Sequence, residues 1–353
     1  MTRVTRTDQV IGGRYRVLAE LGRGGMGVVW RAEDTFLGRQ VAVKEVLSPS
    51  GDAARRAMRE ARSAARLSHP SVVKVFDVVE EDGRPWVVME YVEARSLHEV
   101  IKQDGPLPPE RAARVGRQLL SALDAAHRAG ILHRDVKPGN VLLAKGDRAV
   151  LTDFGIALME GDATLTRAGG LLGSPAYIAP ERFLGERAVP ASDLWALGAT
   201  LYAATSGRPP FHRDDPAAVL GAVLNEEPPI PPQAQALRPV LEGLLRKDPR
   251  ERMRAGVAEA VLVAILEDRP PRLPPVAHPQ ATGGGTETTT AIADGPVAGP
   301  IAGPVAGPVA ATTALSVVPE RDGELSWRLG GVLAYAGMAL LLLGSLFVLL
   351  SSR

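Results

Sequence analysis

An aspartate and an asparagine five positions apart are the first residues in this chain that could do chemistry together. They are Asp135 and Asn140, in the sequence His-Arg-Asp-Val-Lys-Pro-Gly-Asn. On one loop, the Asp135 carboxylate could accept the proton of an incoming hydroxyl while the Asn140 amide oxygen binds a metal ion. Asp153 opens an Asp-Phe-Gly sequence thirteen residues after Asn140 and could hold that metal against nucleotide phosphates. With Lys137 to neutralise charge on the transferring group, these residues predict a phosphoryl-transfer site.

A glycine-rich loop lies near the N-terminus, where residues 21–29 contain the spacing Gly-x-Gly-x-x-Gly-x-Val. Glycines let the backbone approach phosphates closely and adopt conformations that a Cβ would forbid. A dinucleotide-binding fold uses the same spacing, but there the loop opens a helix, whereas residues 28–32 continue as a strand. The loop therefore favours a nucleotide-binding hairpin. The residues we expect at the nucleotide are Leu21, Gly22, Gly24, Gly27 and Val29.

Lysine is rare in this chain, since only six of its 41 basic residues are lysines. Two of the six, Lys44 and Lys137, fall where phosphoryl transfer needs a compact positive charge. Lys44 ends the strand-like run 41–44, from which its ammonium could reach the α and β phosphates. An anion must hold it there, and we expect Glu60, in the helix-like stretch 52–67, to be its partner. The alternative for Lys44 and Glu60 is a solvated surface charge.

Two kinds of periodicity divide the first part of the chain. Short runs of alternating apolar and polar residues predict a small strand-rich lobe over about residues 8–92, with one helix. Apolar residues at three-to-four spacing then predict a larger, mainly helical lobe over residues 93–268. Its candidate helices include 109–129, 192–206, 216–225 and 234–246. The expected fold class is α+β, with two lobes.

The rest of the chain has a different composition. Residues 269–326 are rich in Pro, Gly, Ala and Thr, which cannot bury enough surface to offset the entropy of ordering, so they predict a disordered linker. Residues 327–350 predict a transmembrane helix, because no charged residue occurs from 329 to 352 and about 20 apolar residues cross a bilayer. The alternative, a buried core helix, has no core to enter after such a linker. More arginines precede the span than follow it, which favours a cytoplasmic linker and an extracytoplasmic tail at 351–353.

Overall composition argues against several classes of function. Lys plus Arg is 41 and Asp plus Glu is 40, so the chain has no general positive field to attract nucleic acid. The absence of cysteine excludes disulfides, thiolate metal sites and thiol catalysis. Apart from His133, the histidines are scattered without ligand spacing, so no zinc site is expected. The N-terminus has no apolar stretch of signal-peptide length, so we expect the two lobes to stay in the cytoplasm.

The motifs together resemble those of protein kinases, specifically the bacterial eukaryotic-like (Hanks-type) serine/threonine kinases with a single membrane span. The resemblance covers residues 8–268 and continues through Ala-Pro-Glu at 179–181, Asp-Leu-Trp-Ala-Leu-Gly at 193–198 and Asp-Pro-Arg-Glu-Arg at 248–252. It implies a bilobal protein-kinase fold and the cofactors ATP and Mg²⁺, with Mn²⁺ as a substitute. It also implies protein substrates phosphorylated on serine and threonine, and a single-pass cell-membrane protein with its kinase domain in the cytoplasm.

The resemblance assigns roles within the catalytic site. Asp135 would be the catalytic base, and Asn140 and Asp153 would bind the metals. Glu60 would be the partner of Lys44. Lys137 is typical of kinases that phosphorylate serine and threonine. The residues implied around adenine are Ala42 and the hinge residues Met89, Glu90 and Val92.

The resemblance also implies structural roles outside the chemistry. Glu181 and Arg252 would form an ion pair that supports the fold. Asp193 would anchor the backbone of the catalytic loop. His133 would be a neutral, core-packing residue against Phe154.

Residues 153–181 correspond to the activation segment of the family. Arg134 would there bind a phosphate, and Thr164 or Thr166 could carry it, which would order the segment through charge-assisted hydrogen bonds. The alternative is two passive loop threonines. Ser174 stands where the family usually has threonine and preserves a hydroxyl near the substrate.

Two questions stay open at the level of sequence. Gly330, Gly337 and Gly344 recur every seven residues, a stripe suited to close packing of two spans, so the chain is either a homodimer or simply anchored by one span. A catalytically silent kinase-like scaffold or nucleotide-binding signalling module is the alternative function. Silent relatives usually lack an equivalent of Lys44, Asp135 or Asp153, whereas this chain has all three.

Overall fold

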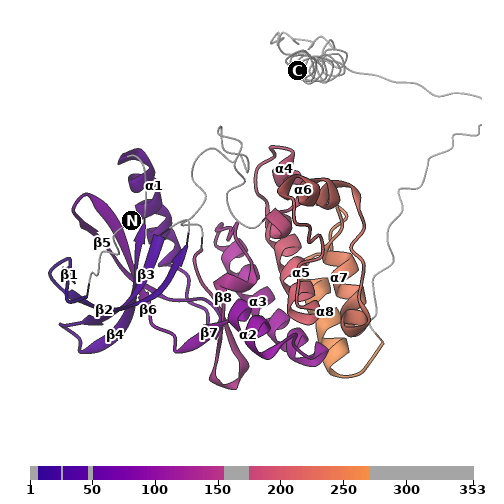
Figure 1. Cartoon of the computed structure of the whole chain (residues 1–353), viewed down its shortest axis with the longest axis horizontal. Coiled ribbons are helices and arrows are strands. Elements are labelled where there is room, and N and C mark those ends of the chain that lie inside the picture. The colour runs from indigo at the N-terminus through magenta and orange to yellow at the C-terminus, as the bar shows by residue number, and fades with distance from the viewer. Residues whose placement is uncertain (1–6, 25–26, 47–50, 155–174, 271–353) are drawn as a thin grey trace, which may run out of the picture. The chain divides into compact units, whose positions relative to one another are not determined.

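The computed structural model describes residues 7–24, 27–46, 51–154 and 175–270, which form two lobes (Figure 1). The first lobe, the N-lobe, is an antiparallel sheet with one helix, and the second, the C-lobe, is mainly helical. This arrangement confirms the α+β, two-lobed fold expected for the first 268 residues.

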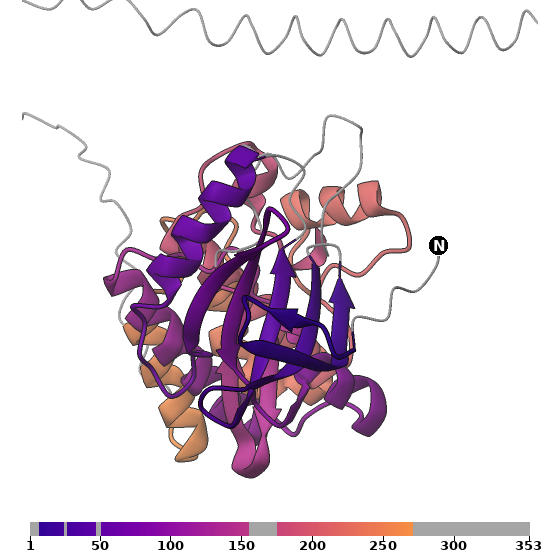
Figure 2. The same ribbon diagram turned by 90° about the vertical axis from the view of Figure 1, so that its left-hand side faces the viewer.

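The N-lobe sheet has six strands in the order β1-β2-β3-β4-β6-β5. The strands are β1 (Val10–Ile11), β2 (Tyr15–Gly24), β3 (Gly27–Asp34), β4 (Arg39–Val46), β5 (Val75–Glu81) and β6 (Arg84–Glu90). Helix α1 (Gly51–Ala64) packs against β5 and β6 and lies along one side of the sheet (Figure 2).

Strand β4 is apolar on both faces, because both faces of the sheet are covered. Val41 and Val43 belong to one apolar cluster, and Ala42 and Val46 belong to a second cluster that also contains Ala61 of α1. Side chains alternate along a strand, so Lys44 lies on the same side as Ala42, toward α1.

The C-lobe combines a small sheet with a helical core. The sheet has the order β7-β8-β9, with β7 (Ala94–Ser96), β8 (Val141–Ala144) and β9 (Arg148–Leu151). The helices are α2 (Leu97–Asp104), α3 (Pro109–Arg128), α4 (Pro180–Phe183), α5 (Pro190–Ser206), α6 (Pro216–Asn225), α7 (Arg238–Leu244) and α8 (Ala255–Leu266). Short 3-10 turns occur at Pro138–Asn140, Lys145–Asp147, Pro175–Tyr177 and Pro232–Leu237.

Helix α5 is the centre of the C-lobe and is buried along almost its whole length, from Ser192 to Thr205. It packs against α3 and α7. A Cβ at Gly198 would lie 2.8 Å from the Cβ of Leu244, so glycine permits the close approach of α5 and α7. This packing holds the start of α5, with Asp193, in a fixed place.

The predicted helix over 234–246 is wrong in detail, because the segment is divided into the 3-10 turn Pro232–Leu237 and α7. Pro239 lies in the first turn of α7. Proline has no N–H and fits only in the first turn of a helix, so a new helix must begin just before it. The other three candidate helices are observed, as α3, α5 and α6.

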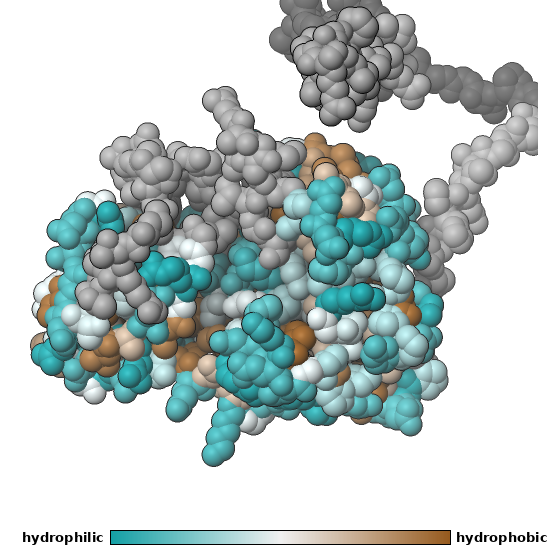
Figure 3. Space-filling view, in the orientation of Figure 1, coloured by the Kyte–Doolittle hydropathy of each residue, from teal (hydrophilic) through white to brown (hydrophobic). Residues whose placement is uncertain are grey.

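Within the described residues, no helix is both long enough and apolar enough to cross a membrane. The predicted linker at 269–326 lies almost wholly outside those residues, and the predicted span at 327–350 and the tail at 351–353 lie entirely outside them. On the face shown in Figure 3, hydrophobic side chains of the described lobes occur in small groups among hydrophilic ones. Leu21 of the glycine loop is one of the exposed apolar side chains, at 46% exposure.

Candidate active site

The segment 131–140, which carries Asp135, is fixed to α5 by one buried carboxylate. Asp193 accepts hydrogen bonds from the backbone N–H of His133 at 2.9 Å and from the backbone N–H of Arg134 at 2.7 Å. The ring of His127, in the last turn of α3, lies 2.8 Å from the same carboxylate. Asp193 is 1% exposed, so these partners satisfy a charge that has little access to water. The predicted anchoring role of Asp193 is confirmed, and His127 is an additional partner that the sequence analysis missed.

His133 is a neutral core residue. Its Nδ1 accepts the backbone N–H of Asp135 at 3.2 Å, so the proton is on Nε2, which donates to the carbonyl of Thr152 at 2.8 Å. Burial lowers the pKa of His133. The ring contacts Phe154 with centroids 4.5 Å apart and planes tilted by 60°. The predicted packing role is confirmed, and His133 joins the catalytic loop to Thr152, the residue before Asp153.

Asp135 is held by two neighbours on its own loop. Nζ of Lys137 lies 2.7 and 2.9 Å from its two carboxylate oxygens. Nδ2 of Asn140 donates to the Asp135 carboxylate at 2.9 Å and to its backbone carbonyl at 2.8 Å. The structure therefore brings together the base, the cation and the amide that the sequence predicted. Both amide protons of Asn140 have a partner at Asp135, which leaves the Asn140 carbonyl oxygen as the group that can bind a cation.

Two residues of the site have left-handed backbones. The φ angle of Arg134 is 68° and that of Asp153 is 64°. Residues other than glycine rarely adopt this conformation, and it persists where surrounding contacts enforce it. At Arg134 the enforcing contact includes the bond from its N–H to Asp193. One of these positions directly precedes the expected base Asp135, and the other is the expected metal ligand itself.

Lys44 pairs with Asp153. Their Nζ and Oδ1 atoms are 2.7 Å apart, and Lys44 is only 4% exposed although it carries a charge. Burial alone would raise the pKa of Asp153, but the Lys44 charge and hydrogen bond more than offset burial and hold the pKa below its usual value. Asp153 is thus a carboxylate at neutral pH, the form that binds metals.

The expected pairing of Lys44 with Glu60 is wrong for this structure. Glu60 instead accepts a bond from Nη1 of Arg134 at 3.3 Å, and its Oε2 is buried with no hydrogen-bond partner among the described residues. Burial raises the pKa of Glu60, and Arg134 offsets part of that rise. Two carboxylates and two cations in one region allow two pairings of equal charge. Residue types alone do not select one of these pairings, because Lys44, Glu60, Arg134 and Asp153 lie on separate segments of the chain.

The apolar residues Val29, Ala42, Met89 and Val92, expected around the nucleotide, lie in one cluster, the adenine cluster. Ala42 and Met89 are buried, and Val29 and Val92 pack against them. Strand pairing places Val29 opposite Lys44 and Ala42 opposite Met89. Leu142 of β8 joins the same cluster from the C-lobe and was missed. Its signal is the apolar run directly after Asn140, whose strand faces the N-lobe.

The hinge residue Glu90 is tied down on two sides. Its N–H donates to the carbonyl of Lys74 at 2.8 Å, and its side chain pairs with Arg148 at 3.1 Å. The hinge is thus connected to β9 of the C-lobe by a side-chain contact that the sequence analysis did not anticipate.

The glycine loop has room for a ligand in its described part. A Cβ at Gly22 or Gly24 would meet no heavy atom within 4 Å, so glycine is not required there by contacts within the described protein. Gly27 pairs with Gly24 across the β2–β3 turn and has a φ of 149°, a conformation that favours glycine. The open space at Gly22 and Gly24 would allow phosphates to approach the backbone of the loop closely.

The residues present also fit a divalent cation bound together with a nucleotide. Among the described residues, no group of three or more His, Cys, Asp or Glu side chains could hold a metal by itself. Mg²⁺ in nucleotide enzymes is bound by one or two protein oxygens together with substrate phosphates. The carboxylate of Asp153 and the side-chain amide oxygen of Asn140 meet that description.

The protein kinase domain model matches residues 15–262 of the chain, well over half of its length. The chain belongs to the protein kinase family. Among its relatives, it is 40% identical over 303 residues to the serine/threonine-protein kinase PknA of Mycobacterium tuberculosis, an alignment that covers 81% of this chain and 70% of PknA.

Two further relatives are also named as serine/threonine-protein kinases. The chain is 41% identical over 270 residues to the serine/threonine-protein kinase PknE of Mycobacterium bovis, covering 73% of this chain and 48% of PknE. It is 39% identical over 294 residues to a Streptomyces coelicolor protein named as a probable serine/threonine-protein kinase, covering 78% of this chain and 43% of that protein. The chain spans less than half the length of these two relatives. All three relatives are named as serine/threonine-protein kinases, the Streptomyces coelicolor protein as a probable one.

The C-terminal end of the activation segment, at Glu181, is held by an ion pair with Arg252. Arg252 pairs with Glu181 through two bonds of 2.8 and 2.9 Å, and Ser192 donates to the same carboxylate at 2.7 Å. Arg252 also donates to the carbonyls of Arg246, Lys247 and Ala191. Burial would raise the pKa of Glu181, but Arg252 and Ser192 lower it overall. The predicted Glu181–Arg252 ion pair is confirmed.

Several predicted residues of the kinase lie outside the described residues. They are Thr164, Thr166 and Ser174 of the activation segment. Their roles stay predictions. Arg134, which the family would use to bind the phosphate of that segment, is described, and it contacts Glu60.

Proposed function

We propose that this kinase transfers the γ-phosphoryl group of ATP to serine and threonine hydroxyls of proteins, including its own activation segment. The observation that carries the proposal is the fixed position of Asp135, whose carboxylate is held by Lys137 and Asn140 on a loop anchored to Asp193. A base in this position can accept the hydroxyl proton while the nucleophile is kept in line.

Each neighbour of Asp135 has a separate task. Lys137 orients the carboxylate and supplies positive charge where the phosphoryl group passes. Asn140 keeps the Asp135 backbone in place, and its side-chain amide oxygen can bind a cation. We propose Mg²⁺ as that cation, with Mn²⁺ as a substitute, and it would neutralise charge on the phosphates when bound. Asp153 would share it.

We further propose that Lys44 exchanges partners during activation. In the described structure Lys44 pairs with Asp153, and Glu60 pairs with Arg134. A phosphate on Thr164 or Thr166 would compete with Glu60 for Arg134. The phosphate carries up to two negative charges and the Glu60 carboxylate only one, so the Arg134 guanidinium would bind the phosphate more strongly. Glu60 would then be released to pair with Lys44, the pairing that the kinase resemblance implies for catalysis.

Membrane attachment is a proposal from the sequence. Residues 327–350 would form one C-terminal span, with the kinase domain on the cytoplasmic side, and the stripe at Gly330, Gly337 and Gly344 would suit either a homodimer or a plain anchor. The support is the uncharged stretch from 329 to 352 and the distribution of arginines around it.

The test is the identity of the phosphorylated residues. The purified chain would be incubated with ATP and Mg²⁺ and a protein acceptor, and phosphorylated positions would be mapped by mass spectrometry. Phosphoserine and phosphothreonine on the acceptor, with phosphate on Thr164 or Thr166, are expected. Phosphotyrosine as the main product would contradict the proposed specificity, and an activation segment without phosphate would contradict the proposed switch.

A further inference from the structure

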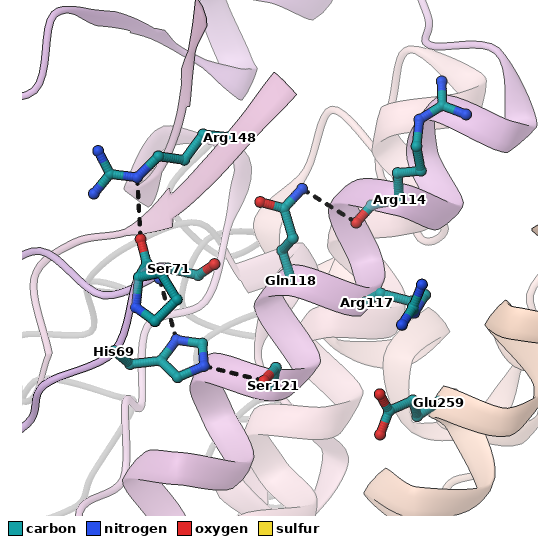
Figure 4. Close-up of a pocket in the computed structure, with 9 residues that line it drawn as sticks. His69, Ser71, Arg114, Arg117, Gln118, Ser121, Arg148 and Glu259 are labelled. Atoms are coloured by element: carbon teal, nitrogen blue, oxygen red, sulfur yellow. Dashed lines mark hydrogen bonds between the residues drawn. The ribbon is translucent and has the colours of Figure 1, made fainter. Parts of the chain in front are cut away.

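A pocket lies where the turn after α1 meets the C-lobe, and none of Asp135, Lys137 and Asn140 lines it. It has a volume of about 420 Å³ and is formed by the turn after α1, by α3, by β9 and by α8 (Figure 4). Its lining residues are His69, Pro70, Ser71, Arg114, Arg117, Gln118, Ser121, Arg148 and Glu259. Three arginines and one glutamate make it predominantly positive.

Two of the arginines of the pocket have no acidic partner among the described residues. Arg114 and Arg117 are three positions apart on α3, and both are exposed. Figure 4 shows their guanidiniums pointing in different directions, that of Arg114 away from Ser121, so both side chains would turn toward a shared anion. Within the described part of the chain, neither guanidinium has a hydrogen bond or ion pair, whereas Arg111, one turn earlier, pairs with Asp147 at 2.8 Å. Like charges at this spacing repel each other, so an anion bound to both would relieve the repulsion.

The serine of the pocket offers a further donor. His69 Nδ1 accepts the N–H of Ser71 at 3.1 Å, so the imidazole proton is on Nε2 and is donated to Ser121 Oγ at 3.0 Å (Figure 4). The hydroxyl proton of Ser121 is therefore available to a ligand. The same geometry excludes a nucleophilic serine activated by histidine, because Nε2 already carries a proton and cannot act as the base. Burial, with a smaller effect of Arg128, lowers the pKa of His69 and keeps the ring neutral.

The other polar walls of the pocket are already bonded. Arg148 donates to the carbonyl of Pro70 and to Glu90, both at 3.1 Å. Gln118 donates to the carbonyl of Asp147 at 2.9 Å and accepts the N–H of Ala149 at 3.0 Å. These bonds fix the walls and leave Arg114, Arg117 and Ser121 as the donors available to a ligand.

We propose that this pocket binds a phosphorylated serine or threonine side chain of a partner protein. A phosphate carries a charge of about −1.5 to −2 at neutral pH, which matches the two unpaired guanidiniums. It also has three terminal oxygens for the three donors, and guanidinium forks bind such oxygens bidentately. A carboxylate has one charge and two oxygens, so it would leave one donor unused.

The proposal goes beyond the proposed function and depends on neither the membrane span nor the activation switch. The choice of occupant rests on the proposed function, whose products are proteins phosphorylated on serine and threonine, so the pocket would dock a partner that has already been phosphorylated. Glu259, on α8, faces the same cavity and would oppose an anion. Removing the Glu259 charge should therefore strengthen phosphate binding, whereas removing an arginine should weaken it.

The test is fluorescence anisotropy with the purified full chain and a labelled peptide that carries one phosphothreonine in an otherwise glycine and alanine sequence. Arg114→Ala and Arg117→Ala should each weaken binding about tenfold, the effect of losing one charge-assisted bidentate contact. Arg111→Ala is the matched control, since it removes the same charge from the same helix, and it should change binding less than about twofold because Arg111 is already paired. Glu259→Gln should tighten binding.

Phosphorylation of a peptide substrate that has no phosphate of its own should be unchanged in all four variants, which would show that they are folded. The proposal would be overturned by equal binding of a peptide with glutamate in place of phosphothreonine. It would also be overturned by equal losses in Arg111→Ala and Arg117→Ala, which would indicate a diffuse charge effect. Unchanged binding in the Arg114→Ala/Arg117→Ala double variant would show that the phosphopeptide binds at another site, which would contradict the proposal.

Discussion

Glu60 of helix α1 accepts a hydrogen bond from Arg134, the residue immediately before the catalytic aspartate, at 3.3 Å. This contact joins the N-lobe helix to the catalytic loop. It also leaves Lys44 to pair with Asp153 at 2.7 Å. We infer that the site has two alternative sets of ion pairs, and that the position of α1 decides which set is formed.

The first prediction tests the contact between Glu60 and Arg134. Arg134→Met should reduce the ratio of activities between autophosphorylated and phosphatase-treated enzyme toward one, because it removes both the restraint on Glu60 and the proposed phosphate ligand. The measurement is the initial rate on a serine peptide for both forms. Arg62→Met, at an exposed arginine of α1, the helix that carries Glu60, is the control and should keep the wild-type ratio. An unchanged ratio in Arg134→Met would rule out the exchange.

The second prediction concerns the pair formed by Lys44 and Asp153. Lys44→Met and Asp153→Asn should each abolish autophosphorylation and leave the fold intact, since they remove phosphate and metal contacts. Each should also lower the free energy of unfolding by about 1–3 kcal/mol, because a buried or half-buried charge loses its partner. The double variant should lose less than the sum of the single losses. Urea unfolding measures these energies, and near wild-type turnover in either single variant would contradict the assigned roles.

The third prediction concerns Arg252 and Glu181. Arg252→Ala should lower the free energy of unfolding by about 3–5 kcal/mol, since it leaves the buried Glu181 carboxylate with one hydroxyl partner. Arg250→Ala, at an exposed position in the same motif, should change stability by less than about 0.5 kcal/mol. If Arg252→Ala does not fold, the pair replacement Glu181→Gln with Arg252→Met should restore folding, because it leaves no unpaired charge. A loss similar to that of Arg250→Ala would show that the ion pair is not supporting the fold.

The fourth prediction concerns pH and Lys247, one of the six lysines. Its Nζ lies 4.1 Å from the ring centroid of Phe211 and donates to the carbonyl of Val223 at 2.7 Å. Burial lowers the pKa of Lys247 to about 8, although two nearby glutamates offset part of the shift. The unfolded chain keeps this proton up to its ordinary pKa of 10.5.

Between these two values the unfolded state binds more protons than the folded state, so the contribution of Lys247 to the free energy of unfolding should rise with pH. Below pH 8 the residue is charged in both states and contributes no slope. Lys247→Met should remove this rise between about pH 8 and 10.5, measured by urea unfolding at several pH values. The same slope in the variant and the wild type would show that another group causes it.

Much of the site could be predicted from the sequence because its residues lie close together along the chain. Asp135, Lys137 and Asn140 share one short loop, so their spacing alone brings them into contact. Glu181 and Arg252 are 71 positions apart, and their pairing came from the family resemblance instead.

The rest of the site depends on how separate elements pack. His127 reaches Asp193 only because α3 lies beside α5, and Leu142 reaches the adenine cluster only because β8 faces the N-lobe. The partner of Lys44 was wrong for the same reason, since it depends on the position of α1. The pocket containing Arg114 and Arg117 could not be predicted either, because a pair of arginines on a helix is usually a solvated face.

We propose that Asp135 is the base of the phosphoryl-transfer reaction. The most direct measurement is the single-turnover rate of transfer from radiolabelled ATP to a serine peptide, compared between the wild type and Asp135→Asn. ATP binding is measured separately for both. Asp135→Asn should bind ATP as the wild type does and transfer phosphate about 10²–10⁴ times more slowly, the usual contribution of a positioned base. A transfer rate within a fewfold of the wild type, with ATP binding retained, would contradict the account.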